Sequence, residues 1–107
     1  MLGIISITYE NENSIFNINI KEKKLSYMNI VKEITEDSIF NYLESLLRII
    51  STWKEEYLDS TTIDGFNWNL IIRYEDLKIK KYSGHADTPL NFEAFISLNQ
   101  DLIDEVI

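Results

Sequence analysis

The stretch that decides the fold is residues 67–74, Asn-Trp-Asn-Leu-Ile-Ile-Arg-Tyr. Its first, third and seventh side chains are polar, whereas the second, fourth, sixth and eighth are large and apolar or aromatic. Successive side chains of a strand point to opposite faces of a sheet, so this period of two predicts a strand with one buried face. Glu75-Asp76 then forms a turn, and a second alternating run at 77–82 completes a hairpin.

Three further strands are expected in the first 30 residues. The runs at 2–9, 14–20 and 25–30 are rich in β-branched residues or alternate in polarity, and polar turns separate them. They predict an antiparallel meander with one solvated face. In the first run, Ile5, Ile7 and Tyr9 are expected on one face.

A helix is expected after Glu33, where the apolar period changes from two to 3.6. Thr35 or Asp37 can cap its N-terminus, and we expect it to end between Trp53 and Tyr57. Its apolar stripe consists of Ile39, Leu43, Leu46, Leu47, Ile50 and Trp53. We expect Trp53 to be mostly buried, as we do Trp68 in the hairpin.

A second helix is expected after the hairpin, with Thr88 as its N-cap and Pro89 at its first position. Its apolar stripe consists of Phe92, Phe95, Ile96, Leu102, Ile103 and Val106. Asn99 interrupts the stripe, which predicts a break there. The sequence therefore predicts one α+β domain over 1–107, in the order βββ-α-ββ-α, with a mostly antiparallel sheet and two helices packed on one face.

The charge is strongly negative, with 18 acidic and 10 basic residues and a net charge of −8. No Lys or Arg follows His85, whereas five acids do. An acidic surface repels phosphate backbones, so direct nucleic-acid binding is not expected. It suits a basic protein partner, although acidity also serves solubility.

The chain has no cysteine, and its first apolar run ends at Ile7, too short for a signal peptide or a membrane span. Small secreted domains usually carry disulfides. We therefore expect a cytoplasmic protein that does not contact a membrane.

The last third of the chain carries a recognisable pattern. It reads Asp64-Gly65, Trp68-x-Leu70-x-Ile72-x-Tyr74, Tyr82-x-Gly84 and Pro89-x-Asn91-Phe92. Over about the last 40 residues the chain thus resembles small uncharacterised proteins of Gram-positive bacteria, which have no assigned function. The resemblance implies a fold and a bacterial setting rather than a mechanism. The chain departs from the pattern at Leu77, where a glycine that suits a tight hairpin usually follows the acidic turn residue.

Candidate catalytic groups are few. His85 is the only histidine, and with Asp87 it lies in a loop near a predicted helix start, where it could act as an acid or base. The simpler interpretation is a loop histidine beside a capping aspartate, because no serine or cysteine nucleophile pattern is present. Three isolated glycines offer no phosphate cradle, and we expect no cofactor.

Metal binding is not expected either. The acids before the hairpin, Glu55, Glu56, Asp59 and Asp64, do not have the spacing of a calcium loop. One histidine without cysteine nearly excludes zinc. A solvated acidic rim is the favoured interpretation.

The lysines form two groups in or beside the hairpins. They are Lys21, Lys23, Lys24, Lys78, Lys80 and Lys81. They could contact phosphate weakly, but edge-strand lysines also block sheet-to-sheet aggregation, and the overall charge favours that interpretation.

These observations favour a non-enzymatic acidic binding module that inhibits or neutralises a partner protein. An immunity protein for a bacterial toxin, or a phage-encoded inhibitor of a nuclease, would fit. Tyrosines are frequent at interface hot spots, so Tyr57 and Tyr82 join the acids as candidates. The expected partner-binding residues are Glu55, Glu56, Tyr57, Asp59, Asp64, Tyr82, Glu93, Asp101, Asp104 and Glu105.

Two alternatives remain open. One is a small hydrolase or metal-dependent enzyme that uses His85 and Asp87 with the acids at 55–64. The other is a structural subunit of a homo-oligomer, for instance a homodimer paired through an open sheet edge or an aromatic patch.

Overall fold

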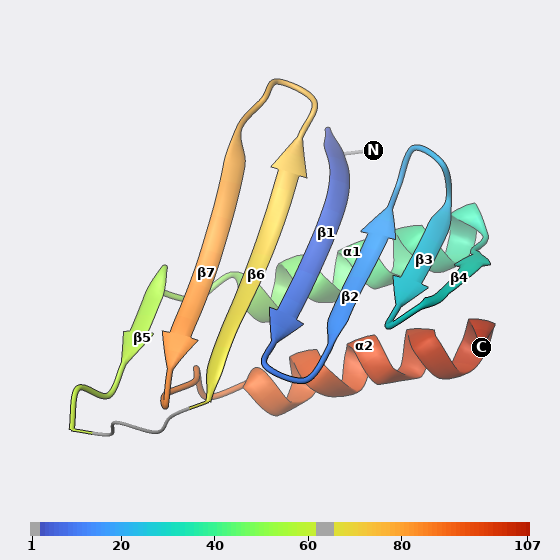
Figure 1. Ribbon diagram of the computed structural model, residues 1–107. Coiled ribbons are helices and arrows are strands. Elements are labelled where there is room, and N and C mark those ends of the chain that lie inside the picture. Colours follow the sequence, from blue (N-terminus) through green and yellow to red (C-terminus); the bar gives the residue numbers. More distant parts are fainter. Residues whose placement is uncertain (1–2, 62–65) are drawn as a thin grey trace.

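A computed structural model describes residues 3–61 and 66–107, and within them the chain forms a sheet with two helices on one of its faces (Figure 1). The elements in chain order are β1 (Ile4–Asn11), β2 (Ile15–Asn19), β3 (Lys24–Tyr27), β4 (Ile30–Glu33), α1 (Glu36–Ile50), β5 (Glu56–Leu58), β6 (Asn67–Tyr74), β7 (Ile79–His85) and α2 (Phe92–Val106). The fold is α+β. The order is ββββ-α-βββ-α, so the structure adds β4 and β5 to the strands that the sequence predicts.

The sheet has seven strands in the order β4-β3-β2-β1-β6-β7-β5. All neighbours are antiparallel except β5 and β7, which are parallel. The two central strands, β1 and β6, therefore join the N-terminal meander to the later hairpin. The helices α1 and α2 contact each other and run in opposite directions across the sheet (Figure 1).

The core lies between the sheet and the helices. Its sheet side consists of Ile4, Ile7 and Tyr9 on β1, Phe16 and Ile18 on β2, Leu25 on β3, Trp68, Leu70 and Ile72 on β6, and Tyr82 on β7. The helices add Ile39, Tyr42, Leu43, Leu46, Ile50, Phe92, Phe95, Leu102 and Ile103. The predicted phase of residues 67–74 is confirmed, and both tryptophans are buried as expected.

The prediction that Ile5 of β1 faces the core is wrong. The pairing of β1 with β6 shifts between Ile4 and Ser6, so one extra residue is inserted there. Such a bulge changes which side chains face the core. As a result Ile4 is buried together with Ile7 and Tyr9, whereas Ile5 is only partly buried.

The expected third strand, 25–30, is in fact a hairpin. β3 ends at Tyr27 and β4 begins at Ile30, with Met28 at the turn in a left-handed conformation (φ 56°). A bulky residue rarely adopts this conformation, so the sequence carries no clear turn there. β4 forms one edge of the sheet, and all four of its residues are exposed.

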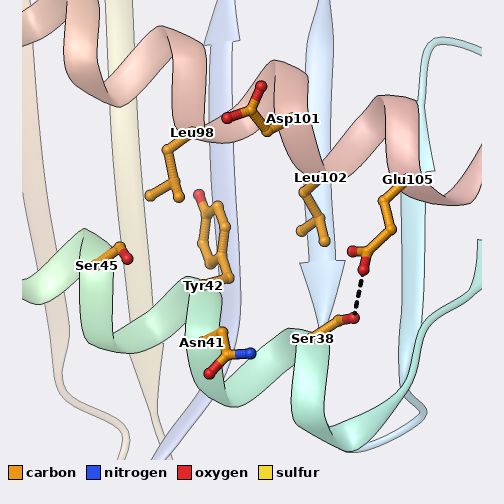
Figure 2. A pocket seen from close by; sticks show the side chains of 8 residues that line it. All are labelled: Ser38, Asn41, Tyr42, Ser45, Leu98, Asp101, Leu102 and Glu105. Atoms are coloured by element: carbon orange, nitrogen blue, oxygen red, sulfur yellow. Dashed lines mark hydrogen bonds between the residues drawn. The ribbon is translucent and has the colours of Figure 1, made fainter.

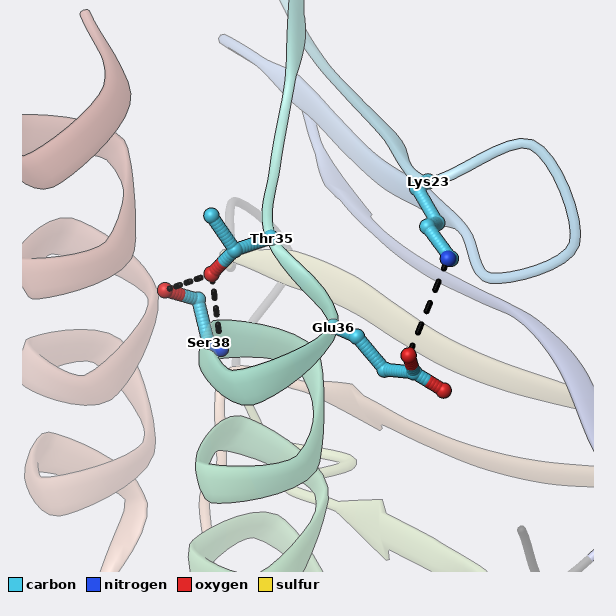
Figure 3. Close-up of polar contacts among 4 residues, drawn as sticks. All are labelled: Lys23, Thr35, Glu36 and Ser38. Carbon is cyan, nitrogen blue, oxygen red and sulfur yellow. Dashed lines mark hydrogen bonds and ion pairs between the residues drawn. The ribbon is translucent and has the colours of Figure 1, made fainter.

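Thr35 caps α1, as the sequence allows, because its Oγ1 accepts a hydrogen bond from the Ser38 amide at 3.1 Å (Figure 3). A side-chain acceptor there satisfies one of the free amides of the first turn. Glu36 beside it forms a 3.8 Å ion pair with Lys23 from the turn before β3 (Figure 3). The strand layer and the helix layer are thus linked at this end.

The expected end of α1 near residues 53–57 is wrong, because the helix stops at Ile50. The Trp53 amide donates to the Ile50 carbonyl at 3.0 Å, which turns the chain back and buries the Trp53 ring. The residues after it leave the helix to form β5, which pairs with β7.

The second helix also differs from expectation. It begins at Phe92 rather than at Pro89, with Asn91 as the N-cap residue. The Asn91 side chain does not cap the helix, because it accepts from Trp53 Nε1 at 2.5 Å and donates to the Ile49 carbonyl at 2.7 Å. It therefore holds the end of α1 against the start of α2.

Asn99 does not break α2, which continues to Val106. The side chain is 5% exposed, and its Oδ1 accepts a hydrogen bond of 2.6 Å from the Tyr42 hydroxyl on α1. A buried polar group is tolerated when it is hydrogen-bonded. What resembles a helix break in the sequence is a polar contact between the helices.

Three residues of the C-terminal sequence pattern, Trp68, Gly84 and Phe92, lie together at one end of β6. The Trp68 indole lies across Gly84 of β7, and a Cβ on Gly84 would clash with that ring and with the Asp87 carbonyl. Trp68 Nε1 donates to the same carbonyl at 3.0 Å, and its ring centre is 4.8 Å from that of Phe92. These described residues of the pattern have packing roles.

Leu77, where the pattern has a glycine, is 90% exposed and left-handed (φ 69°). Its amide donates to the Tyr74 carbonyl at 3.1 Å and so closes the turn between β6 and β7. The turn thus has the geometry that favours glycine, although leucine occupies it.

Candidate protein-binding surface

The first group of expected binding residues lies at the β5 edge of the sheet. Glu56 and Tyr57 are part of β5, with Glu55 just before it and Asp59 just after it. Both glutamates are exposed. Asp64 lies outside the described residues.

The two tyrosines proposed as contacts have structural partners. Tyr82 is 5% exposed and its ring centre lies 5.7 Å from that of Trp53, so its side chain is part of the core and not of a surface. Burial, more than the nearby charges, raises the pKa of its hydroxyl. Tyr57 is half-buried, and its hydroxyl accepts a hydrogen bond from the Lys54 amide at 2.8 Å.

The second group of expected residues lies on α2, and all four are exposed acids. Glu93 is in the first turn, near the β5 end of the sheet, whereas Asp101, Asp104 and Glu105 are in the second half of the helix (Figure 1). Eight residues separate Glu93 from Asp101, about 12 Å along a helix axis. The acids of the C-terminal half therefore do not form one patch.

Instead, the structure places α1 beside α2 and so adds acids that are not among the expected partner-binding residues. The carboxylates of the two helices are Glu36, Asp37, Glu44, Glu93, Asp101, Asp104 and Glu105. All seven are exposed, and both helices lie wholly within the described residues. We call these two helices, seen from the side away from the sheet, the helical layer. The signal in the sequence that could have predicted this surface is the polar side of each amphipathic helix.

Arg48 is the one basic residue within the helical layer, and it forms an i,i+4 ion pair with Glu44 at 3.9 Å. Seven acids and one base give these 30 residues a net charge of −6, out of −8 for the whole chain. The remaining nine Lys and Arg residues belong to strands, turns and loops. The negative charge of the protein is therefore concentrated on one layer.

A groove of about 410 Å³ runs between α1 and α2 (Figure 2). Its lining is Ser38, Asn41, Tyr42 and Ser45 from α1, and Leu98, Asp101, Leu102 and Glu105 from α2. Figure 2 shows the Tyr42 ring between the two helices and the Asp101 carboxylate on α2 above it. No Lys, Arg or His is among these lining residues.

The polar groups of the groove differ in their partners. The Ser38 hydroxyl donates to Glu105 Oε1 at 3.1 Å and so connects the helices at one end of the groove (Figure 2). Asp101 forms no ion pair with the described residues. Its carboxylate is therefore the acidic group of the groove most available to a bound cation.

Beneath the groove, Tyr42 and Asn99 form a buried polar pair. Burial raises the pKa of the Tyr42 hydroxyl strongly, so the group stays protonated and acts as the donor to Asn99. Asn99 Nδ2 has no hydrogen-bond partner among the described residues. Leaving such a group unpaired costs about 1–3 kcal/mol, so this pair is a weak point of the helix interface.

His85 and Asp87 are tied to the structure. His85 ends β7, and its Nδ1 lies 2.6 Å from Asn67 Oδ1 on β6. The Asp87 carboxylate accepts from the Thr88 amide at 2.9 Å, and its carbonyl holds the Trp68 indole. Among residues 3–61 and 66–107, no group of three or more His, Asp or Glu side chains is placed to hold a metal ion.

No protein-family model, no curated protein and no solved structure matches this chain. Within the described ranges, neither α1 nor α2 has the length and apolar character needed to cross a membrane.

Proposed function

We propose that this protein is a non-enzymatic binding module whose helical layer docks on a basic partner protein and inhibits or neutralises it. An immunity protein for a bacterial toxin acts in this way, as does a phage-encoded inhibitor of a nuclease. The cytoplasm of a bacterial cell is the setting in which we expect it. The observation that carries the proposal is the concentration of seven carboxylates and one base on two adjacent helices.

Charge segregation of this kind serves association more than folding. Complementary potentials steer two proteins together and fix their orientation, whereas charge needed only for solubility can be spread over the surface. Enzymes that act on nucleic acids have basic clefts, and exposed carboxylates can occupy the phosphate positions there. The helical layer supplies such carboxylates from two adjacent helices.

An inhibition titration tests this proposal. The partner is recovered by affinity capture, and its own activity is measured against increasing amounts of this protein. We expect inhibition to saturate at an equimolar ratio. The helical variant Asp101→Lys/Asp104→Lys should shift the titration to higher concentration, whereas the matched control Glu22→Lys/Glu75→Lys, in turns of the sheet, should not.

Two outcomes contradict the proposal. A captured partner whose activity does not change on binding would exclude inhibition. Equal potency of the helical variant and the turn variant would exclude the helical layer as the docking surface.

The enzymatic alternative has less support, because the side chains of His85 and Asp87 have hydrogen-bonding roles in the fold. Its test is direct. Loss of the biological effect in a folded His85→Ala variant would favour it, and an unchanged effect would exclude a catalytic histidine.

A further inference from the structure

We propose that the groove between α1 and α2 receives an arginine side chain of the basic partner. This inference rests on the proposed function and names the chemistry that the helical layer recognises. The groove has about 410 Å³ of space and opens on the layer that carries a net charge of −6. A cation is therefore the ligand that its surroundings favour.

The lining of the groove matches the two parts of an arginine side chain. The apolar lining consists of the half-buried Leu98 and of Tyr42 and Leu102, of which only 3% and 5% are exposed. Such a lining can pack against the methylene stem of an arginine. A lysine has the same stem, but its compact ammonium is more strongly hydrated and gains less from such contact.

The polar lining of the groove consists of hydrogen-bond acceptors placed on opposite walls. Asp101 and Glu105 offer carboxylates on α2, and Asn41 and Ser45 offer neutral oxygens on α1. A guanidinium has five N–H donors in a plane, so it can reach acceptors on more than one side. The lining holds no basic residue, and although the Ser38 hydroxyl already donates to Glu105 Oε1, Asp101 forms no ion pair with the described residues.

Peptide binding to the intact protein tests the groove. The probes are a short peptide of alternating arginine and glycine and its lysine counterpart, measured by calorimetry at low salt. We expect the arginine peptide to bind about fivefold more tightly than the lysine peptide. The guanidinium can form bidentate hydrogen bonds with a carboxylate and can pack against the apolar lining of the groove. NMR should show the largest shifts for the Tyr42 ring and the Leu98 and Leu102 methyl groups.

Variants inside and outside the groove distinguish binding in the groove from attraction by the overall negative charge of the helices. Asp101→Asn should weaken arginine binding by about three- to tenfold, the loss expected for one charge-assisted hydrogen bond at an accessible site. Asp104→Asn removes the same charge from the same helix but outside the groove, and it should cost less than twofold. Ser45→Leu fills the groove without a charge change and should also weaken binding, whereas Ser97→Leu on α2 should not.

Equal affinity for the two peptides, with equal losses of affinity in Asp101→Asn and Asp104→Asn, would contradict the proposed arginine site. Such a result would leave the proposal of an acidic docking layer intact. An undiminished affinity of Ser45→Leu would contradict the arginine site as well. If neither peptide binds at low salt, both the groove and the electrostatic basis of the proposed function are wrong.

Discussion

The inner and outer faces of the two helices differ in burial, in packing and in charge. The inner face packs on the sheet, where the ring centre of Phe92 on α2 lies 6.0 Å from that of Trp53, which follows α1, and 4.8 Å from that of Trp68 on β6. The outer face carries exposed carboxylates, of which only Glu36 and Glu44 form ion pairs with described residues. Core contacts and exposed carboxylates thus lie on different sides of the same helices, and so can be changed separately.

The largest effect should come from the inner face. Trp68 is 1% exposed, so Trp68→Ala should reduce the free energy of unfolding by about 3–5 kcal/mol, as removal of a large core aromatic does. The neighbouring Phe66 is 40% exposed, and Phe66→Ala should cost below about 1 kcal/mol. Denaturant titration measures both. A Trp68→Ala cost as small as that of Phe66→Ala would mean that the aromatic cluster does not stabilise the fold.

The buried pair between the helices should have an intermediate effect. Tyr42→Phe removes the hydroxyl that donates to Asn99 Oδ1. The unpaired side-chain amide of Asn99 should then lower the free energy of unfolding by about 1–3 kcal/mol. Replacing both partners, as Tyr42→Phe/Asn99→Leu, should restore most of that loss, because no buried polar group then lacks a partner. Thermal and denaturant unfolding compare the three proteins. Additive losses in the double variant would contradict this account of the pair.

Alkaline pH should destabilise the folded protein. Burial raises the folded-state pKa of Tyr42, Tyr9 and Tyr82 above the ordinary value of 10.0. A raised pKa means that the folded protein holds these protons more tightly than the unfolded chain does, so the stabilisation is full below pH 10 and is lost as pH rises above it. Unfolding titrations from pH 8 upward should show this decline, with a shallower slope in Tyr42→Phe. Stability that is independent of pH above 10 would contradict the burial of these hydroxyls.

The smallest effect on stability should come from the turn between β6 and β7, far from both faces. Leu77 adopts a left-handed conformation that glycine accepts more easily, and its exposed side chain contributes little packing. Leu77→Gly should therefore stabilise the protein by about 0.5 kcal/mol. The control Lys81→Gly, within β7, should destabilise it by about 0.5–1 kcal/mol. Destabilisation by Leu77→Gly would indicate that the leucine has a contact that its exposure does not reveal.

The sequence predicted the inner face of the sheet better than its edges. The alternation at 67–74 identified β6 because a strict period of two leaves only the phase to choose. β5 escaped prediction because three residues gain strand structure only by pairing with β7, which is distant in the chain. Asn99 was misread as a helix break because its partner, Tyr42, is 57 residues away.

The candidate surface was predicted in part for the same reason. Exposed acids on α2 follow from their position opposite the apolar stripe, and the structure places them in solvent. Tyr82 was misplaced because an aromatic residue near a strand end carries no mark of which side it faces. The acids of α1 could be joined to those of α2 only once the helices were known to lie side by side.

Stopped-flow association kinetics test whether the outer face of the helices binds a basic partner through charge, as proposed. With the captured partner, we expect the association rate to fall steeply with ionic strength, since exposed charges are screened beyond a Debye length of about 8–10 Å at physiological salt. Asp101→Lys/Asp104→Lys should slow association by about tenfold at low salt while the free energy of unfolding stays within about 0.5 kcal/mol of the wild type. An association rate that depends neither on salt nor on this double reversal would contradict the account.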